Sequence, residues 1–272
     1  MSYLGETKPL KLGDLAKLRA AGEPITMLTC YDATFAGLLD RCGVEMLLVG
    51  DSLGNVVQGH TSTLPVTMQH MEYHVACVAR GARRSMVVAD MPFGSYLEGR
   101  EQAMRNAARL MAAGGHMVKL EGGAYMAETV RFLVERGVPV CAHIGLTPQS
   151  VHQLGGFRIQ GKSEAGAEAL LADARALEAA GAACMVVELV PTALGTRLTE
   201  AMTACAVIGI GAGPACHGQI LVLHDMLGLT PPPRPKFARD FMPAGGGSVE
   251  GAVKAFVAAA KARTFPAAGE GY

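Results

Sequence analysis

The sequence carries no net charge and no long apolar run. Lys plus Arg and Asp plus Glu number 24 each, so there is no basic field to hold nucleic acid or an anionic membrane surface. No apolar run reaches the roughly 18 residues of a membrane-spanning helix, and residues 1–6 lack the charged-then-apolar pattern of a secretion signal. We therefore expect a cytoplasmic protein with small-molecule partners, no nucleic acid and no membrane.

The sequence also has no Cys-x-x-Cys pair. Its cysteines are odd in number and widely spread, at positions 30, 42, 77, 141, 184, 205 and 216. This spacing argues against a structural zinc site and against a disulfide framework. Several of these cysteines lie inside apolar runs, so we interpret them as small buried hydrophobic residues of a protein in a reducing compartment.

Four short apolar runs each end at an acidic residue, and each is followed by a helical pattern. The runs are 46–49 before Asp51, 85–89 before Asp90, 116–120 before Glu121 and 184–187 before Glu188. Short apolar runs of this kind are typical of parallel strands that are buried on both faces. Because the carboxyl ends of parallel strands lie at one face of a sheet, we expect the four acids to converge.

Seven clear strand–helix units and a plausible eighth, in 272 residues, predict a single (βα)₈ barrel domain, a fold that typically takes about 250 residues. We expect a short helix over 10–21 ahead of strand one, a short eighth strand at 236–237 and a last helix over 249–262. The segment 264–272 is expected to be a flexible tail. An open doubly wound sheet is the alternative architecture.

The acids are candidates for a metal site. Asp51, Asp90 and Glu121 offer only hard oxygen ligands, which favours Mg²⁺ or a similar ion over zinc. Lys119 lies two residues before Glu121 and so points to the same side of its strand. Any one acid alone would be better explained as a helix N-cap or as an acceptor that anchors a loop, and we interpret Asp32, at the start of a helix that runs to Cys42, as such an N-cap. Three acids in succession favour a site. Glu188 stands apart and is free to act as a general base.

Other motifs carry weaker signals. Residues 156–163 match the phosphate-loop pattern G-x-x-x-x-G-K-[ST], but that loop must follow directly from a strand, and here a mobile lid is the better interpretation. Residues 209–213 lack the dinucleotide-binding spacing and are interpreted as a glycine turn that lets a ligand approach the backbone. His143 ends strand five and faces the same side as the acids, so it is a candidate for ligand contact.

Six segments resemble the ketopantoate hydroxymethyltransferase (3-methyl-2-oxobutanoate hydroxymethyltransferase) family. They are Leu-Val-Gly-Asp-Ser-Leu-Gly (48–54), continued by 57–67, Ala-Asp-Met-Pro-Phe (89–93), Met-Val-Lys-Leu-Glu-Gly-Gly (117–123), His-Ile-Gly-Leu-Thr-Pro-Gln-Ser (143–150), 155–162 and Ile-Gly-Ile-Gly-Ala-Gly (208–213). The resemblance runs in order from about residue 26 to residue 241. No single motif carries it, which makes it specific.

The resemblance implies a barrel of the phosphoenolpyruvate/pyruvate type that assembles as a homo-oligomer, typically a decamer. It implies transfer of a one-carbon unit from 5,10-methylenetetrahydrofolate to 3-methyl-2-oxobutanoate, which gives 2-dehydropantoate in the first committed step towards pantothenate and coenzyme A. The magnesium-binding acids of the family match Asp51, Asp90 and Glu121.

The resemblance also implies which residues contact the keto acid and which residue is the base. The keto-acid contacts match Asp51, Ser52, Asp90 and Lys119, and the catalytic base matches Glu188. Tyr31 and His143 match residues near the substrate. One departure is His217, which stands where the family commonly has an aspartate.

Two rival functions stay open at this point. One keeps the barrel and the metal but makes the protein a carbon–carbon lyase or mutase that acts on a related 2-oxo acid without folate. The other is a non-catalytic protein that binds a metal or a keto acid, because fold alone does not determine function.

Overall fold

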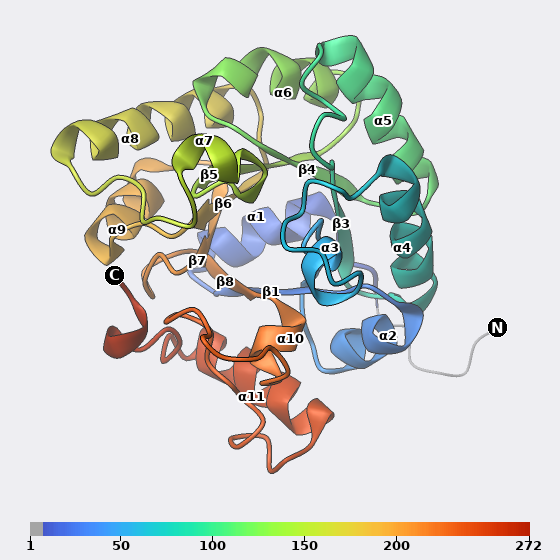
Figure 1. Cartoon of the computed structure of the whole chain (residues 1–272), viewed down its shortest axis with the longest axis vertical. Helices are drawn as coiled ribbons and strands as arrows, with labels where there is room; N and C mark the ends of the chain where they lie inside the picture. Colours follow the sequence, from blue (N-terminus) through green and yellow to red (C-terminus); the bar gives the residue numbers. More distant parts are fainter. Residues whose placement is uncertain (1–7) are drawn as a thin grey trace.

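The computed structural model describes residues 8–272 and shows a closed barrel of eight parallel strands in sequential order (Figure 1). Hydrogen bonds between β1 and β8 close the barrel. The strands are β1 (Ile25–Thr29), β2 (Met46–Val49), β3 (Met86–Asp90), β4 (Met117–Glu121), β5 (Val140–Gly145), β6 (Cys184–Glu188), β7 (Ala206–Ile210) and β8 (Gly218–Leu221). The predicted (βα)₈ barrel is confirmed, and the open doubly wound sheet is wrong.

Most helices form a ring outside the strands, whereas α1 (Leu12–Ala20) lies near the centre of the view in Figure 1, behind the strands. The longer ones are α1 (Leu12–Ala20), α2 (Ala33–Arg41), α4 (Met68–Gly81), α5 (Arg100–Ala112), α6 (Ala127–Val134), α8 (Glu164–Ala179), α9 (Thr192–Ala201) and α11 (Val249–Lys261). Short helical turns lie in the loops: α3 (Leu53–Val56), η1 (Ala124–Met126), η2 (Pro148–Ser150), α7 (Val151–Leu154), α10 (Leu223–Met226) and η3 (Ala268–Glu270). The expected first and last helices are confirmed.

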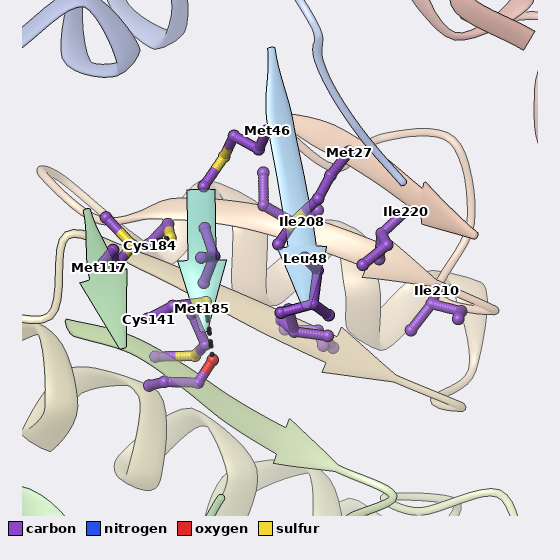
Figure 2. Packing of buried hydrophobic residues seen from close by; sticks show 14 of the residues in the cluster. Met27, Met46, Leu48, Met117, Cys141, Cys184, Met185, Ile208, Ile210 and Ile220 are labelled. Carbon is purple, nitrogen blue, oxygen red and sulfur yellow. Dashed lines mark hydrogen bonds between the residues drawn. The ribbon is translucent and has the colours of Figure 1, made fainter. Parts of the chain in front are cut away.

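The interior of the barrel is apolar and rich in sulfur, as Figure 2 shows. Its side chains come from alternate positions of the strands and include Met27, Met46, Met117, Cys141 and Cys184, all almost fully buried. Every residue of β1 to β4 is buried, because helices cover the outer face and side chains fill the inner one. This packed interior leaves space for a ligand only beyond the strand ends.

The eighth strand does not lie at 236–237 as expected. It is Gly218–Leu221, which follows β7 closely in sequence and pairs with both β7 and β1. A side chain at Gly218 would place a Cβ atom 2.4 Å from the carbonyl oxygen of Ile25, so only glycine permits this strand to approach β1. The strand is too short and too glycine-dependent to give a periodic apolar signal.

Residues 264–272 make more contacts than a flexible tail would. Phe265 is buried against Phe241 and Phe256. The backbone N–H of Thr192 donates to the carbonyl oxygen of Tyr272 at 2.8 Å, and Lys236 donates to the carbonyl of Gly271 at 2.7 Å. These contacts come from residues distant in the sequence, which explains why the local composition suggested a flexible segment.

Two features bear on the earlier expectations about location and redox state. Across residues 8–272, no helix combines the length and the apolar character needed to cross a membrane. All seven cysteines are free thiols, and most of them are buried.

Candidate active site

The four acids that end strands β2, β3, β4 and β6 line one cavity at the carboxyl end of the barrel. Strand register explains the grouping, because Asp90 is the partner of Lys119 across β3 and β4, and Glu121 is the partner of His143 across β4 and β5. The cavity has a volume of about 630 Å³. The predicted convergence of the acids is confirmed.

Lys119 and Asp90 form a buried ion pair at the base of the cavity. The second carboxylate oxygen of Asp90, Oδ2, accepts a hydrogen bond from the backbone N–H of Asp51 at 3.1 Å. Burial lowers the pKa of Lys119, but the surrounding acids, led by Asp90 and Glu121, outweigh burial and raise it. Lys119 is therefore a permanent positive charge among the acids.

Asp51 is the acid whose protonation the site perturbs most clearly. Burial, and then the negative charges of Asp90 and Glu121, raise its pKa to about 8. Lys119 and a hydrogen bond from Gln149 oppose the shift without cancelling it. Burial also raises the pKa of Asp90, against the effect of Lys119. The site thus holds more negative charge than one ammonium group neutralises.

Two residues that the sequence analysis missed hold these acids in place. The Gln149 side-chain amide donates to Asp51 Oδ2 at 2.9 Å and to the carbonyl oxygen of Met91 at 3.0 Å. The Tyr96 hydroxyl donates to Gln149 Oε1 at 2.6 Å and accepts the Glu121 backbone N–H at 3.2 Å. The backbone N–H of Gln149 donates to Glu121 Oε2 at 3.0 Å. One signal was available, since Gln149 belongs to a segment that resembles the family.

His143 lies between the metal-site candidate Glu121 and the base candidate Glu188. Its Nδ1 is 3.2 Å from Glu121 Oε1, and its Nε2 is 3.2 Å from Glu188 Oε2. Burial, and then Lys119, lower the pKa of His143, but the two glutamates outweigh both and raise it to about 9. The Glu188 side chain is 15% exposed, against 3% for Glu121, so Glu188 is the acid that is open to the cavity.

Ser52 and Tyr31 meet at the rim of the cavity. The Tyr31 hydroxyl and Ser52 Oγ are 2.9 Å apart, and Ser52 lines the cavity. Burial raises the pKa of Tyr31. Its hydroxyl therefore stays neutral and takes part in hydrogen bonds without losing its proton. The neighbouring Asp32 is an N-cap, as its place before a helix predicts, because its side chain caps α2 by accepting the Phe35 N–H at 2.9 Å.

The position of Glu188 depends on backbone features at two residues. Gly145 is its register partner on β5, and a Cβ atom at Gly145 would lie 2.2 Å from the carbonyl oxygen of Glu188. Leu189 has a φ of 52°, a left-handed conformation that side chains with a Cβ atom rarely adopt and that is often found at functional sites. The chain therefore turns sharply directly after the base candidate.

The weaker motifs have structural explanations. Residues 156–163 do not follow from a strand, because η2 and α7 separate them from β5. Ser163 caps α8 by accepting the Gly166 N–H at 3.1 Å. At the glycine turn after β7, a Cβ atom on Gly211 would lie 2.8 Å from the ring of Phe237. The group that approaches this backbone is thus a side chain of the same chain.

A divalent cation fits the site by charge and by donor chemistry. Asp51, Asp90 and Glu121 are buried carboxylates, and among the described residues Glu121 Oε1 makes no well-aligned hydrogen bond, although His143 Nδ1 lies 3.2 Å away. Hard oxygen donors of this kind suit Mg²⁺. As the side chains of residues 8–272 are placed, no three acidic, histidine or cysteine side chains form a group that could hold a metal. Binding therefore requires the carboxylates to reorient, or the substrate to complete the ligands.

Comparison with known proteins identifies relatives along almost the whole chain. The model of the ketopantoate hydroxymethyltransferase family matches residues 9–268. The 3-methyl-2-oxobutanoate hydroxymethyltransferase of Azoarcus sp. (strain BH72) is 65% identical over 268 residues, which cover 98% of each chain. The protein of the same name from Aromatoleum aromaticum (strain DSM 19018 / LMG 30748 / EbN1) is 62% identical over the same length and coverage.

Solved structures share the fold at much lower sequence identity. A putative phosphonomutase from Burkholderia cenocepacia J2315 is 19% identical with a TM-score of 0.62, over 80% of this chain and 95% of that one. A 2,3-dimethylmalate lyase of the PEP mutase/isocitrate lyase superfamily is 15% identical with a TM-score of 0.58, over 77% and 80%. These likenesses show a shared barrel fold. The sequence matches show that the chain belongs to the ketopantoate hydroxymethyltransferase family.

Proposed function

We propose that this protein transfers a hydroxymethyl group from 5,10-methylenetetrahydrofolate to 3-methyl-2-oxobutanoate, giving 2-dehydropantoate in the first step of pantothenate and coenzyme A biosynthesis. The observation that carries the proposal is the convergence of Asp51, Asp90, Lys119, Glu121 and Glu188 on one cavity, in a chain of this family. This set combines an anion-binding ammonium group, carboxylates suited to a cation and an accessible base.

Asp51, Ser52, Asp90 and Lys119 would bind the keto acid. Lys119 is fixed by Asp90 at the base of the cavity, so its ammonium group supplies positive charge where the carbonyl oxygen of the substrate becomes negative. Ser52 Oγ faces the cavity beside the Tyr31 hydroxyl and can donate a hydrogen bond to a substrate oxygen. Each of these groups is held by a second residue.

Asp51, Asp90 and Glu121 would hold Mg²⁺. When bound, the ion acts as a Lewis acid on the carbonyl of the keto acid and stabilises the charge that develops there. Gln149 keeps two of these acids in position through its hydrogen bonds to Asp51 and Glu121. The charge surplus that raises the pKa of Asp51 is the property that a divalent cation would relieve.

Glu188 would remove the proton from the carbon beside the carbonyl. It is the accessible acid of the cavity, and His143 Nε2 lies 3.2 Å from its Oε2 and restrains the carboxylate. The carbon so deprotonated attacks the methylene group of the folate cosubstrate. Water then supplies the hydroxyl oxygen as the carbon–nitrogen bonds to the methylene are broken, and tetrahydrofolate leaves.

We further propose a cytoplasmic homo-oligomer, with a decamer as the expected assembly. Membership of the family supports this proposal. The free cysteine thiols are compatible with a reducing compartment.

Proton exchange at C3 of 3-methyl-2-oxobutanoate, followed by NMR in deuterated water, tests the assignment. With Mg²⁺ the wild-type protein should exchange this proton, and chelation should stop the exchange. Glu188→Gln should abolish exchange while leaving metal affinity nearly unchanged, and Glu164→Gln on exposed α8 is the matched control. Exchange by Glu188→Gln at the wild-type rate would refute Glu188 as the base.

Adding methylenetetrahydrofolate to the same sample tests the transfer. Hydroxymethyl product should appear only when the folate is present. Cleavage of a related 2-oxo acid without folate would instead identify a lyase, and binding without any exchange would identify a non-catalytic protein.

A further inference from the structure

The cavity is much larger than the keto acid. 3-Methyl-2-oxobutanoate has eight non-hydrogen atoms, and at no more than the roughly 30 Å³ that a water molecule takes up in the liquid, each, they fill at most about 240 Å³. The cavity measures about 630 Å³. More than half of it is therefore left for a second ligand.

The walls of the cavity differ in chemistry from one side to the other. The metal-site acids and Lys119 come from β2 to β4, whereas the wall formed by the ends of β6 to β8, the loop after α10 and the last residue of the chain is largely apolar. This apolar wall consists of Leu189, Ile210, Val222, Phe237 and Tyr272. Glu188 ends β6 at the edge of this wall. A flat ligand bound on the wall would therefore lie next to the proposed base.

Asp225 is an acidic residue beside the apolar wall that the proposed reaction does not use. It lies in α10, is 9% exposed and lines the cavity. Its Oδ1 accepts the Thr230 hydroxyl. Its Oδ2 has no hydrogen-bond donor among residues 8–272 and is not sealed from the cavity. Across residues 8–272, no cationic side chain forms an ion pair with Asp225 within 4 Å.

The other charged residue of this region, Arg234, makes its hydrogen bonds elsewhere. Its three nitrogen atoms donate to the carbonyl oxygens of Thr230 and Gly228 and to the carboxylate of Asp240. This fixes the loop that carries Phe237 and directs all three nitrogen atoms of Arg234 to acceptors other than Asp225. A buried carboxylate with a free oxygen is costly unless a ligand supplies donors.

The opposite end of the wall is fixed as well. Tyr272 is held by the Thr192 N–H, which donates to its carbonyl oxygen at 2.8 Å. The ammonium group of Lys236 lies 5.5 Å from the centre of the Tyr272 ring. A flat ligand would thus find a preformed apolar surface with one carboxylate at its edge.

From this arrangement we propose that the pterin ring of the folate cosubstrate lies on the apolar wall and that Asp225 binds its N3–H and 2-amino groups. This inference rests on the proposed function. The two adjacent N–H donors of the ring form a fork like that of a guanidinium group, which matches a carboxylate in a bidentate manner. Oδ1 retains a lone pair besides the one that accepts the Thr230 hydroxyl. A ring in this position would lie in the same cavity as Glu188, which ends β6.

The test compares two ligands on two proteins. Binding of tetrahydrofolate and of its 2-desamino-2-methyl analogue is measured by calorimetry in the presence of Mg²⁺ and 3-methyl-2-oxobutanoate. The wild type should bind tetrahydrofolate at least about tenfold more tightly than the analogue, because loss of a charge-assisted hydrogen bond is expected to weaken binding by this order. Asp225→Asn should bind tetrahydrofolate at least about tenfold more weakly than the wild type and should distinguish the two ligands much less.

The C3 proton exchange separates this inference from the proposed function. Exchange needs no folate, so Asp225→Asn should exchange as the wild type does while its KM for methylenetetrahydrofolate rises at least about tenfold. Equal binding of both ligands by the wild type would overturn the inference even if the variant fails to fold. Unchanged folate affinity in a folded Asp225→Asn would overturn it too. Absence of exchange in the wild type would instead refute the proposed function.

Discussion

Replacing Asp51 with asparagine should stabilise the metal-free protein while abolishing its activity. The pKa of Asp51 is raised to about 8 in the folded state by burial and by Asp90 and Glu121, against an ordinary value of about 3.9 in an unfolded chain. Between these two values the folded state binds more protons than the unfolded state. The contribution of Asp51 to the free energy of unfolding is therefore fully present below about pH 4 and is lost as the pH rises towards 8.

Asparagine has no charge to bury, so the variant escapes this loss. At about 1.4 kcal/mol per pH unit above the unfolded pKa, the gain is on the order of 4 kcal/mol at pH 7 and about 1–2 kcal/mol at pH 5. The amide oxygen of the introduced side chain can still accept the Gln149 hydrogen bond that Asp51 Oδ2 accepts at 2.9 Å. The geometry of the site should therefore survive the substitution.

The measurement is urea unfolding of the wild type and Asp51→Asn at pH 5, 6, 7 and 8 with a chelator, at one protomer concentration. Asp32→Asn is the matched control, since Asp32 is an exposed N-cap of α2 and asparagine caps equally well. Addition of Mg²⁺ should stabilise the wild type more than the variant. A gain in unfolding free energy that does not grow with pH would show that the acids do not repel one another as described.

Three further substitutions test the framework of the site. Gly145→Ala should lower the melting temperature and the exchange rate together, because its Cβ atom would meet the Glu188 carbonyl oxygen at 2.2 Å; a variant with wild-type exchange would contradict this. Gln149→Leu should cost about 2–4 kcal/mol of unfolding free energy and weaken Mg²⁺ binding in calorimetry, because it leaves the Tyr96 hydroxyl without its acceptor; unchanged metal affinity would argue against this role. Lys119→Met should destabilise the fold at pH 8 by roughly 3–5 kcal/mol, because a buried carboxylate loses its cation, and denaturant curves that match the wild type would refute it.

The barrel and its acids could be predicted because their signals are local. A buried parallel strand is a short apolar run, and the acid that ends it marks the position where the chain enters the cavity. Lys119 and Glu121 could be assigned to one side of β4 from their spacing alone, and both line the cavity in the structure. The N-cap role of Asp32 was likewise visible from its place before a helix.

What the sequence did not reveal depends on contacts between distant residues. Gln149 lies 98 residues from Asp51, and the residues next to it do not indicate that it donates a hydrogen bond to that carboxylate. The closing strand at Gly218 is defined by its approach to Ile25, and the packing of residues 264–272 is defined by Thr192 and Lys236. Composition gives no indication of such partners, so short strands and terminal segments are where local patterns fail.

The excess of buried acid in this site makes sense only in terms of its ligands. Lys119 neutralises Asp90, and His143, with its pKa raised to about 9, lies between Glu121 and Glu188. Asp51 has only the hydrogen bond from Gln149, which does not remove its charge. A fold selected for stability alone would replace Asp51 with a neutral residue, since the apolar barrel beneath it gives no compensation. The acid is retained at a stability cost that grows with pH, and a bound cation would reverse this cost. Stability measured with and without Mg²⁺ therefore reports directly on function.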